Sequence, residues 1–241
     1  MPSKVALSAA PNQQNGCHRL PDNWPVDVTY LTDLTYTAAV TAEVRAGLSR
    51  PTVTTEVHAR IAPEDLTFPS TLARIQIIAD EKHPAYGQRG LFAAQHLAPE
   101  AFIIIYLGQV HTNSLSDTDP KSDYDLNLDG ELGLSVDGAN AGCEARFAND
   151  YRGIAERPNA EFRDCFVQVP STKRAGGVKW EKRTGIFVFS AGKAGHRKAG
   201  IKQGEEILIS YGKGYWESRK TMGKFRGDPD MVRIATAALD A

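Results

Sequence analysis

Four short segments of the 241-residue chain combine glycine, tyrosine, arginine and asparagine at spacings that could build a binding site. In chain order they are GQRGLFA at 87–93, YLG at 106–108, RFANDY at 146–151 with PNA at 158–160, and GEEILISYG at 204–212. Glycine allows a tight turn or a close approach of backbone to a ligand, and tyrosine combines an aromatic face with a hydroxyl. Each segment alone is also common in packed cores, so the interpretation depends on their ordered combination.

That combination resembles the SET-domain family of protein lysine methyltransferases. RFANDY followed by PN is similar to the family's RFINHS followed by PN, and GEEILISYG is similar to its GEEL-x-x-x-YG ending. The match covers residues 73–216. The resemblance implies a mostly β (α+β) fold of short antiparallel sheets with a C-terminal pseudoknot. It also implies S-adenosyl-L-methionine as the cofactor and a lysine side chain of a protein as the substrate.

The resemblance assigns catalytic and channel residues by position. Tyr211 matches the family's essential tyrosine, whose hydroxyl lies beside the methyl group being transferred. Tyr106 matches the tyrosine of the family's Tyr-x-Gly, which lines the lysine channel. Ile209, two residues before Tyr211, occupies a position that limits how many methyl groups are added. Both tyrosines are therefore expected to be catalytic, and all three residues are expected to line the channel.

The cofactor-binding residues implied by the resemblance are Arg89, Gly90, Tyr124, Arg146, Asn149 and Trp216. The main chain at 89–90 is expected to contact the methionine end of the cofactor. The residues at 146 and 149 are expected to hold its carboxylate region and its adenine. Trp216 is expected to stack on the adenine, as aromatic side chains stack on bases. No metal ligand is expected.

Methyl transfer from a sulfonium to an amine sets requirements of its own. Free lysine has a pKa of about 10.4, so it is almost wholly protonated near neutrality. A water-poor aromatic channel and an adjacent sulfonium charge both disfavour the ammonium form. Holding the amine in line with the methyl group supplies further acceleration through proximity. We therefore expect the channel to be dry and aromatic.

Several positions depart from the family pattern. Two residues separate Gly87 and Gly90, where relatives usually have Gly-x-Gly. Asp150 replaces the usual His and Tyr151 replaces the usual Ser. A carboxylate only accepts hydrogen bonds, whereas imidazole also donates, so the contacts to the cofactor are expected to differ. Ile209 has no phenolic hydroxyl to bind a water, which favours di- or trimethylation over strict monomethylation.

Composition excludes several other classes of protein. The chain is 41% hydrophobic and 24% charged, as globular proteins are. The longest apolar run, at 101–107, is far shorter than the roughly 20 residues of a membrane helix. We expect a soluble protein without a secretion signal or membrane partner. The three widely spaced cysteines argue against a disulfide scaffold or a cysteine zinc cluster, and neither GxGxxG nor a P-loop occurs.

The hydrophobic pattern predicts a body of short strands with helices at both ends. Strands are expected at 73–80, 86–93, 101–110, 160–169, 185–191 and 204–212, with a hairpin over 124–138 that turns at Asp129–Gly130. The basic stretch 171–184 is expected to be an exposed hairpin arm. Helical segments are expected at 36–48, 216–225 and 229–241.

These elements suggest four parts. They are a flexible N-terminal tail at 1–25, a helical N-terminal appendage at 26–72, the SET domain at 73–216 and a C-terminal helical segment at 217–241. The cysteine clusters that flank the domain in many histone-modifying relatives are absent. The appendage or residues 216–225 would have to close the lysine channel instead. The N-terminal 70 residues are expected to provide either a homodimer surface or a substrate clamp.

Charge is unevenly distributed although the formal net charge is −1. Residues 117–137 contain seven acids and one base, and residues 171–202 contain nine bases and one acid. An acidic lip would attract a basic tail, of a core histone or another lysine-containing protein, and a basic arm at 173–183 could contact nucleosomal DNA. The resemblance implies a nuclear location, or a nuclear and cytoplasmic one.

Three alternatives stay open. A catalytically silent SET module could bind tails or partners without turnover, an interpretation motivated by Asp150 and the altered glycine turn. The substrate could be a non-histone protein. The segment LSVDGANAG at 134–142 could instead be the acidic-glycine loop of a doubly wound methyltransferase for small molecules or nucleic acid, although it lacks spaced glycines after a βα pattern.

Overall fold

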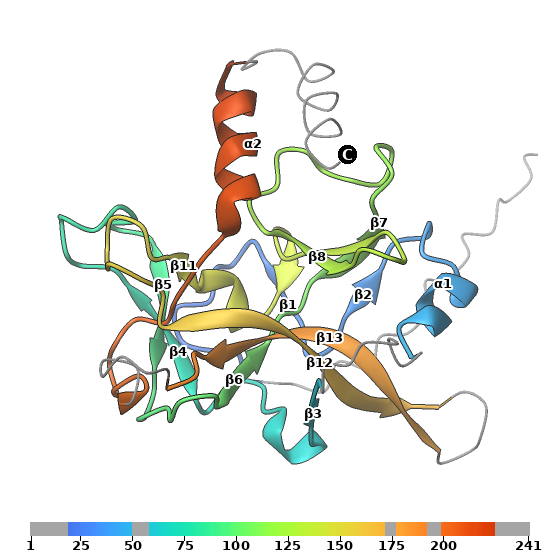
Figure 1. Ribbon diagram of the computed structural model, residues 1–241, viewed down its shortest axis with the longest axis horizontal. Helices are drawn as coiled ribbons and strands as arrows, with labels where there is room; N and C mark the ends of the chain where they lie inside the picture. The colour runs from blue at the N-terminus through green and yellow to red at the C-terminus, as the bar shows by residue number, and fades with distance from the viewer. Residues whose placement is uncertain (1–18, 50–57, 172–176, 192–198, 225–241) are drawn as a thin grey trace, which may run out of the picture.

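Short strands dominate the structure, a computed structural model that describes residues 19–49, 58–171, 177–191 and 199–224 (Figure 1). These residues form fourteen β-strands, most of them two to five residues long, and two α-helices. The strands are arranged in five small sheets. The expected mostly β fold of short sheets is therefore confirmed. The pairing is mixed, because four of the strand pairs are parallel.

The longest elements are β12 (Ala160–Pro170) and β13 (Val178–Val188), which form an antiparallel hairpin across the middle of Figure 1. β3 (Ala59–Ile61) and β6 (Phe102–Ile105) flank this hairpin to complete one four-stranded sheet. Residues 178–184 of the expected exposed arm belong to β13. Glu181, Arg183 and Thr184 are buried there, so this part of the arm is not exposed.

A second four-stranded sheet contains β2 (Thr35–Tyr36), β7 (Gln109–Thr112), β9 (Leu134–Asp137) and β8 (Asp125–Asp129), in that order. β8 and β9 are the expected hairpin. The strand expected at 101–110 is split, since β6 belongs to one sheet and β7 to the other. The break falls at 106–108, where a Cβ on Gly108 would lie 2.3 Å from the Asp137 carbonyl oxygen. Only glycine permits this close approach to β9 at the point where the chain enters the second sheet.

Three two-stranded sheets complete the body. Their pairs are β4 (Ala73–Ile77) with β5 (Arg89–Ala93), β1 (Thr29–Tyr30) with β10 (Ala141–Gly142), and β11 (Asn149–Asp150) with β14 (Leu208–Ile209). The strand expected at 204–212 is reduced to β14, since Gly204 and Gly212 both have positive φ. Ile207 N donates to Leu91 O on one side of this segment and Asn159 N donates to Leu208 O on the other. The expected pseudoknot requires this neighbourhood, and the threading itself stays a prediction.

The N-terminal region is less helical than expected. Helix α1 covers Ala42–Gly47 and is capped by the Thr41 side chain, while Tyr36 lies in β2. A 3₁₀ helix follows at Pro63–Asp65. Each of the three N-terminal strands pairs with a strand from the rest of the chain. The region is thus joined to the sheets along its length, and the domain boundaries stay predictions.

Helix α2 (Gly212–Lys224) follows β14 and stands above the sheets in Figure 1. It begins four residues before the helical segment expected at 216–225, while 1–18 and the segment expected at 229–241 lie outside the described residues. Neither α2 nor α1 is long and apolar enough to cross a membrane.

The core beneath α2 is aliphatic, with Leu91, Val110, Leu134 and Ile207 fully buried. Cys143 and Cys165 are free thiols inside it.

Candidate active site

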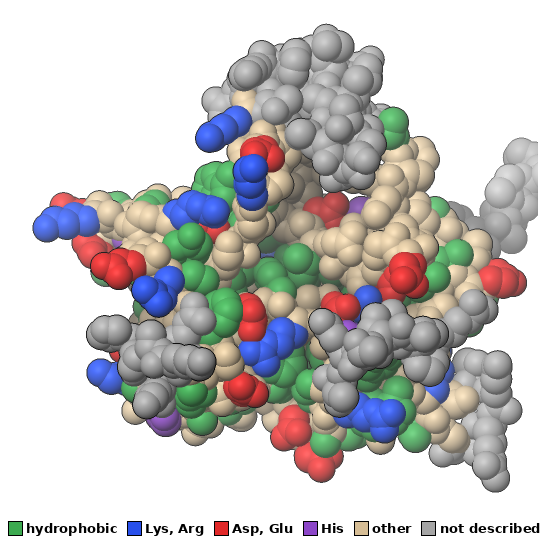
Figure 2. Space-filling view, viewed as in Figure 1, with side chains coloured by type: hydrophobic (Ala, Val, Ile, Leu, Met, Phe, Trp, Pro, Cys, Tyr) green, Lys and Arg blue, Asp and Glu red, His purple; other side chains and the backbone are tan. Residues whose placement is uncertain are grey.

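Two adjoining cavities lie where α2 meets the sheets, and Figure 2 shows the surface hollowed at the base of this helix. The first has a volume of about 510 Å³ and the second about 470 Å³. Both volumes fall in the range of small-molecule sites, about 300 to 1,000 Å³. The two cavities share five lining residues, which are Asp123, Tyr124, Arg146, Tyr211 and Tyr215. These residues define a junction at which two ligands would meet.

Tyr211 lies at this junction, between the end of β14 and the start of α2. Its hydroxyl donates to the Ala148 carbonyl at 3.0 Å, and its backbone N–H donates to Asp150 Oδ2 at 2.8 Å. Burial raises the pKa of the Tyr211 phenol, and the nearby Tyr215 and Asp150 raise it further. Tyr211 is therefore a neutral phenol at physiological pH, held at both its ring end and its backbone.

Asp150, which stands where the family has His, acts as a hydrogen-bond acceptor. Its buried carboxylate accepts from the Tyr211 backbone, from Trp216 Nε1 at 3.3 Å and from Arg152 Nη1 at 3.0 Å. Arg152 also supplies the opposite charge. An acceptor-only side chain fits this position, since all of these partners are donors.

The second cavity is lined by the residues expected to form the lysine channel, Tyr106, Ile209 and Tyr211. Tyr106 is buried, donates its hydroxyl to the Tyr124 carbonyl at 2.7 Å and packs edge-on against Phe162. Ile209 is also buried. This end of the cavity is aromatic and apolar, as a channel that deprotonates lysine requires.

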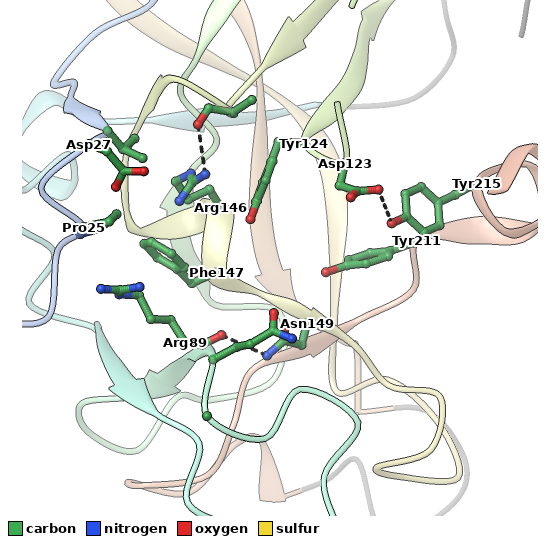
Figure 3. A pocket seen from close by; sticks show the side chains of 14 residues that line it. Pro25, Asp27, Arg89, Asp123, Tyr124, Arg146, Phe147, Asn149, Tyr211 and Tyr215 are labelled. Atoms are coloured by element: carbon green, nitrogen blue, oxygen red, sulfur yellow. Dashed lines mark hydrogen bonds between the residues drawn. The ribbon is translucent and has the colours of Figure 1, made fainter. Parts of the chain in front are cut away.

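Arg146 is a fixed cation between the two cavities. It comes from the 3₁₀ helix Glu144–Phe147, and its guanidinium donates to the carbonyls of Gly138 at 2.7 Å and Ala139 at 3.1 Å. The same group lies over the Tyr124 ring, 4.1 Å from its centroid. Figure 3 shows Arg146 and Tyr124 side by side at the wall of the first cavity.

The turn before β5 forms another wall of the first cavity. Gly87, with φ of +75°, lines the cavity together with Gln88 and Arg89. Gly90 lies behind this wall, because a Cβ there would come within 2.7 Å of Glu206 Oε1. Its lack of a side chain permits packing against Glu206, and it does not line either cavity.

Asn149 is held toward the first cavity by neighbours on two segments. Its Nδ2 donates to Glu206 Oε1 at 2.8 Å and to the Arg89 carbonyl at 3.4 Å. The second oxygen of Glu206 contacts His83 Nε2 at 3.0 Å. His83 Nδ1 accepts from the Ala85 N–H, so its proton is on Nε2 and is donated to Glu206.

Trp216 lines neither cavity. Its ring stacks beside Tyr211 at a centroid distance of 6.4 Å, and its indole nitrogen is directed to Asp150. It is 37% exposed. The structure therefore assigns Trp216 to the support of Tyr211, in contrast to the expected adenine face.

Two parts of the wall were missed by sequence reasoning. Pro25, at the end of the expected mobile tail, lines the first cavity together with Asp27 and Val28 of the expected helical appendage. Tyr215 of α2 lines both cavities, and its hydroxyl donates to Asp123 Oδ1 at 3.0 Å. Trp24, an aromatic residue within a polar stretch, is the one local signal that could have indicated an ordered N-terminal segment.

Several acids of the acidic segment 117–137 are paired with cations, so its charge is smaller than the sequence suggests. Asp123 pairs with Arg219, Asp125 with His111 and Asp129 with Lys182. Asp119 and Asp125 line the second cavity. The acidic lip therefore retains carboxylates at the cavity, but with cations close behind them.

The described bases of the expected DNA-binding arm are also paired within the chain. Lys179 and Arg183 contact Glu181, at 2.9 and 2.7 Å, and Lys182 contacts Asp164 at 2.8 Å. Residues 173 and 174 lie outside the described residues. The three described bases are thus engaged by carboxylates of the protein itself.

The first cavity fits S-adenosyl-L-methionine in size and in chemistry. It combines cationic, anionic and aromatic side chains, which are Arg89, Arg146, Asp27, Asp123, Tyr124 and Phe147. A ligand with a carboxylate, an ammonium group and an aromatic base would find a complementary group for each. The cavity also shares Tyr211 with the second cavity, so ligands in the two would approach each other there.

Comparison with known proteins gave structural matches only. No family model matches the chain, and no curated protein does. A polycomb repressive complex 2 of Chaetomium thermophilum matches with 21% identity over 60% of this chain and a TM-score of 0.40. One in an autoinhibited conformation bound to S-adenosylmethionine matches with 20% identity over 64% of this chain and a TM-score of 0.42. This chain covers 16% and 17% of those two chains.

Proposed function

We propose that this chain is an S-adenosyl-L-methionine-dependent protein lysine N-methyltransferase of the SET-domain type. The observation that carries the proposal is that two cavities share Tyr211, and that the second is aromatic and apolar at the end lined by Tyr106, Phe162 and Ile209. Residues from all four signature segments line one or both of these cavities, which supports the proposal. S-adenosyl-L-methionine, when bound, would supply an electrophilic methyl group on a sulfonium.

The first cavity would hold the cofactor. Arg146 and the 87–89 turn would bind its methionine end, and Asn149, held by Glu206, would bind its adenine side. Tyr124 contributes an aromatic face at the boundary with the second cavity. These groups are fixed before binding, because Arg146 and Asn149 already make their structural hydrogen bonds. Such preorganisation lowers the cost of orienting a ligand.

The second cavity would receive the lysine side chain. Tyr106, Phe162, Ile209 and the ring of Tyr211 line one end of it, and the apolar surroundings at that end disfavour the ammonium form of the lysine. The proton leaves to solvent before the amine attacks. Tyr211 does not act as the base, since burial raises the pKa of its phenol.

Tyr211 would act by orientation. Its hydroxyl proton is donated to the Ala148 carbonyl, so lone pairs of the phenolic oxygen stay available for weak C–H···O contacts with the methyl group. With Ile209 in place of a phenol near this position, the channel favours di- or trimethylation.

We propose a basic protein tail as the substrate, with core histones in the nucleus as the first class to test. Carboxylates of Asp119 and Asp125 line the second cavity and would favour the approach of a cationic tail. A non-histone protein with a basic segment meets the same requirements. The substrate test below therefore includes both.

The decisive experiment compares Tyr211→Phe with the parent on mixed core histones and on a library of basic tail peptides. We expect the parent to add methyl groups to lysine, detected by mass spectrometry, and Tyr211→Phe to lose about 100-fold or more in kcat, as loss of one oriented group at a reacting centre typically does. Tyr86→Phe, at an exposed tyrosine outside both cavities, serves as the matched control and should be unchanged. Full turnover by a folded Tyr211→Phe would remove Tyr211 from the mechanism.

The catalytically silent alternative gives a different result in the same experiment. Asp150 occupies the position of the family's His, which is the observation that keeps this alternative open. A silent module would bind a basic tail, and calorimetry would detect this without any methylated product. Cofactor binding together with product formation would exclude it.

A further inference from the structure

One wall of the first cavity is built by residues outside all four signature segments. We name residues 19–31 the N-terminal strap. Its residues Pro25, Asp27 and Val28 line the cavity, and Figure 3 shows Pro25 and Asp27 on the side away from Tyr211. The strap comes from a part of the chain to which the resemblance assigns no role.

Side chains of the body fix the first half of the strap. Arg89 Nε donates to the Asn23 carbonyl at 2.7 Å, and Asn23 Nδ2 donates to the Ile75 carbonyl at 2.9 Å. Trp24 packs edge-on against Phe147, with ring centroids 5.7 Å apart. Arg89 and Phe147 also line the cavity, so the residues that hold the strap belong to the same site.

The second half of the strap is fixed as firmly. Thr29 and Tyr30 form β1 and pair with β10, and the Tyr30 hydroxyl donates to Glu144 Oε2 at 3.1 Å. Trp24 Nε1 donates to the Val28 carbonyl at 2.7 Å and closes the bend between the two halves. The bend that carries Asp27 is therefore an ordered part of the cavity wall.

The Asp27 carboxylate differs from the other charged groups of this cavity. Arg146 is bound to two backbone carbonyls, and Asp123 is bound to Tyr215 and Arg219. Within the described part of the chain, Asp27 has no hydrogen-bond or ion-pair partner. Its exposed carboxylate lies on the cavity wall and can accept hydrogen bonds from a ligand.

We propose that the N-terminal strap completes the cofactor cavity and that Asp27 binds the ligand by accepting hydrogen bonds from its amino or ribose hydroxyl groups. This inference rests on the proposed function. S-adenosyl-L-methionine carries both kinds of donor, and a bond to a carboxylate is about twice as strong as one between neutral groups. The strap thus acts as part of the binding site, which gives the N-terminal region a role other than a dimer surface or a substrate clamp.

The test is calorimetric binding of S-adenosyl-L-methionine and S-adenosylhomocysteine to the full chain and to Asp27→Asn. We expect Asp27→Asn to weaken both ligands by about tenfold or more. Asp22→Asn is the matched control, because Asp22 lies on the same strap outside the cavity and pairs with the exposed Arg19. It should bind both ligands as the parent does. Thermal unfolding of all three proteins verifies that the exposed substitutions leave the fold intact.

A third ligand identifies the group that Asp27 binds. 5′-Methylthioadenosine retains the ribose hydroxyls but lacks the amino acid. If Asp27→Asn weakens this ligand equally, Asp27 binds the ribose, and if it does not, Asp27 binds the amino group.

The outcomes separate this inference from the function on which it rests. If Asp27→Asn binds the cofactor as tightly as the parent does, the proposed role of Asp27 is wrong, and the methyltransferase proposal still stands. A parent that binds none of the three ligands overturns both.

Discussion

Asp150, which stands where the sequences that this chain resembles usually have His, is explained by what surrounds it. Donors reach its carboxylate from the Tyr211 backbone, the Trp216 indole and the Arg152 guanidinium. A buried carboxylate is costly unless its charge is paired, and Arg152 supplies that charge. Asp150 is therefore a positioning residue. It holds the backbone of Tyr211 and so sets the position of the Tyr211 ring.

We expect Asp150→Asn to lower both stability and turnover. The amide nitrogen of Asn would face at least one of the three donors, and an unsatisfied buried polar group costs about 1 to 3 kcal/mol. Because the change displaces Tyr211, which we propose to orient the methyl group, while Tyr106, Phe162 and Ile209 stay in place, kcat should fall more than KM rises. Chemical unfolding and steady-state kinetics would measure the two effects.

Glu156→Gln is the matched control for this prediction, since Glu156 is exposed on the following loop. It should leave the free energy of unfolding and kcat unchanged. An Asp150→Asn protein with normal kcat would show that the Tyr211 backbone contact has no catalytic role.

At the scale of elements, a buried histidine connects strands β7 and β8. His111 Nε2 contacts Asp125 Oδ1 at 3.0 Å and Nδ1 contacts the Thr112 carbonyl at 2.9 Å. Both partners are acceptors, so both ring nitrogens carry protons. Burial by itself would lower the pKa of His111, but these hydrogen bonds and the charges of Asp125 and Asp137 outweigh it and raise the pKa to about 9.

This contact predicts a pH dependence of stability. The folded pKa of His111, about 9, lies above its unfolded value of about 6.5. Its contribution is therefore fully present below pH 6.5 and is lost as the pH rises to about 9. The whole effect is at most about 3 kcal/mol, since one pKa unit corresponds to about 1.4 kcal/mol.

Two measurements check this prediction. NMR titration should show a His111 ring resonance with a midpoint near pH 9. The unfolding free energy of the parent should fall between about pH 6.5 and pH 9, and His111→Gln should lack this part of the fall. A midpoint near 6.5 would contradict the assignment of two donated hydrogen bonds.

At the scale of the whole molecule, ion pairs within the chain neutralise part of the charge of two regions, the acidic segment 117–137 and the basic segment 171–202. The acids at 123, 125 and 129 each face a cation, and the described bases of β13 each face a carboxylate. Long-range attraction of a basic tail is therefore weaker than the sequence count of charges suggests.

We expect the KM for a basic tail peptide to rise only a few-fold between about 20 mM and 150 mM ionic strength, because screening acts on carboxylates at the second cavity whose charge is already partly neutralised. A peptide with the same target lysine and neutral neighbours should show no change. A flat KM for the basic peptide would exclude the acidic lip. A much steeper rise would place the attraction outside residues 117–137.

The sequence predicted most strands well, because hydrophobic alternation and turn residues are local properties. The hairpin of β8 and β9 follows from alternating leucines on both sides of Asp129–Gly130. The strand at 101–110 was predicted as one because nothing local shows that β6 and β7 belong to different sheets. That break depends on the close approach of Gly108 to Asp137, which lies in another strand.

The sequence by itself determined the mostly β class and the set of signature residues, since both are written in local spacing and order. Tyr106, Tyr124, Arg146, Ile209 and Tyr211 line one or both of the two cavities, and their roles there stay predictions. Only the tertiary structure decided that Trp216 and Gly90 support the wall from behind, that Asp150 holds Tyr211, and that Asp27 lines the first cavity. These contacts join segments separated by tens of residues, and folding alone brings them together.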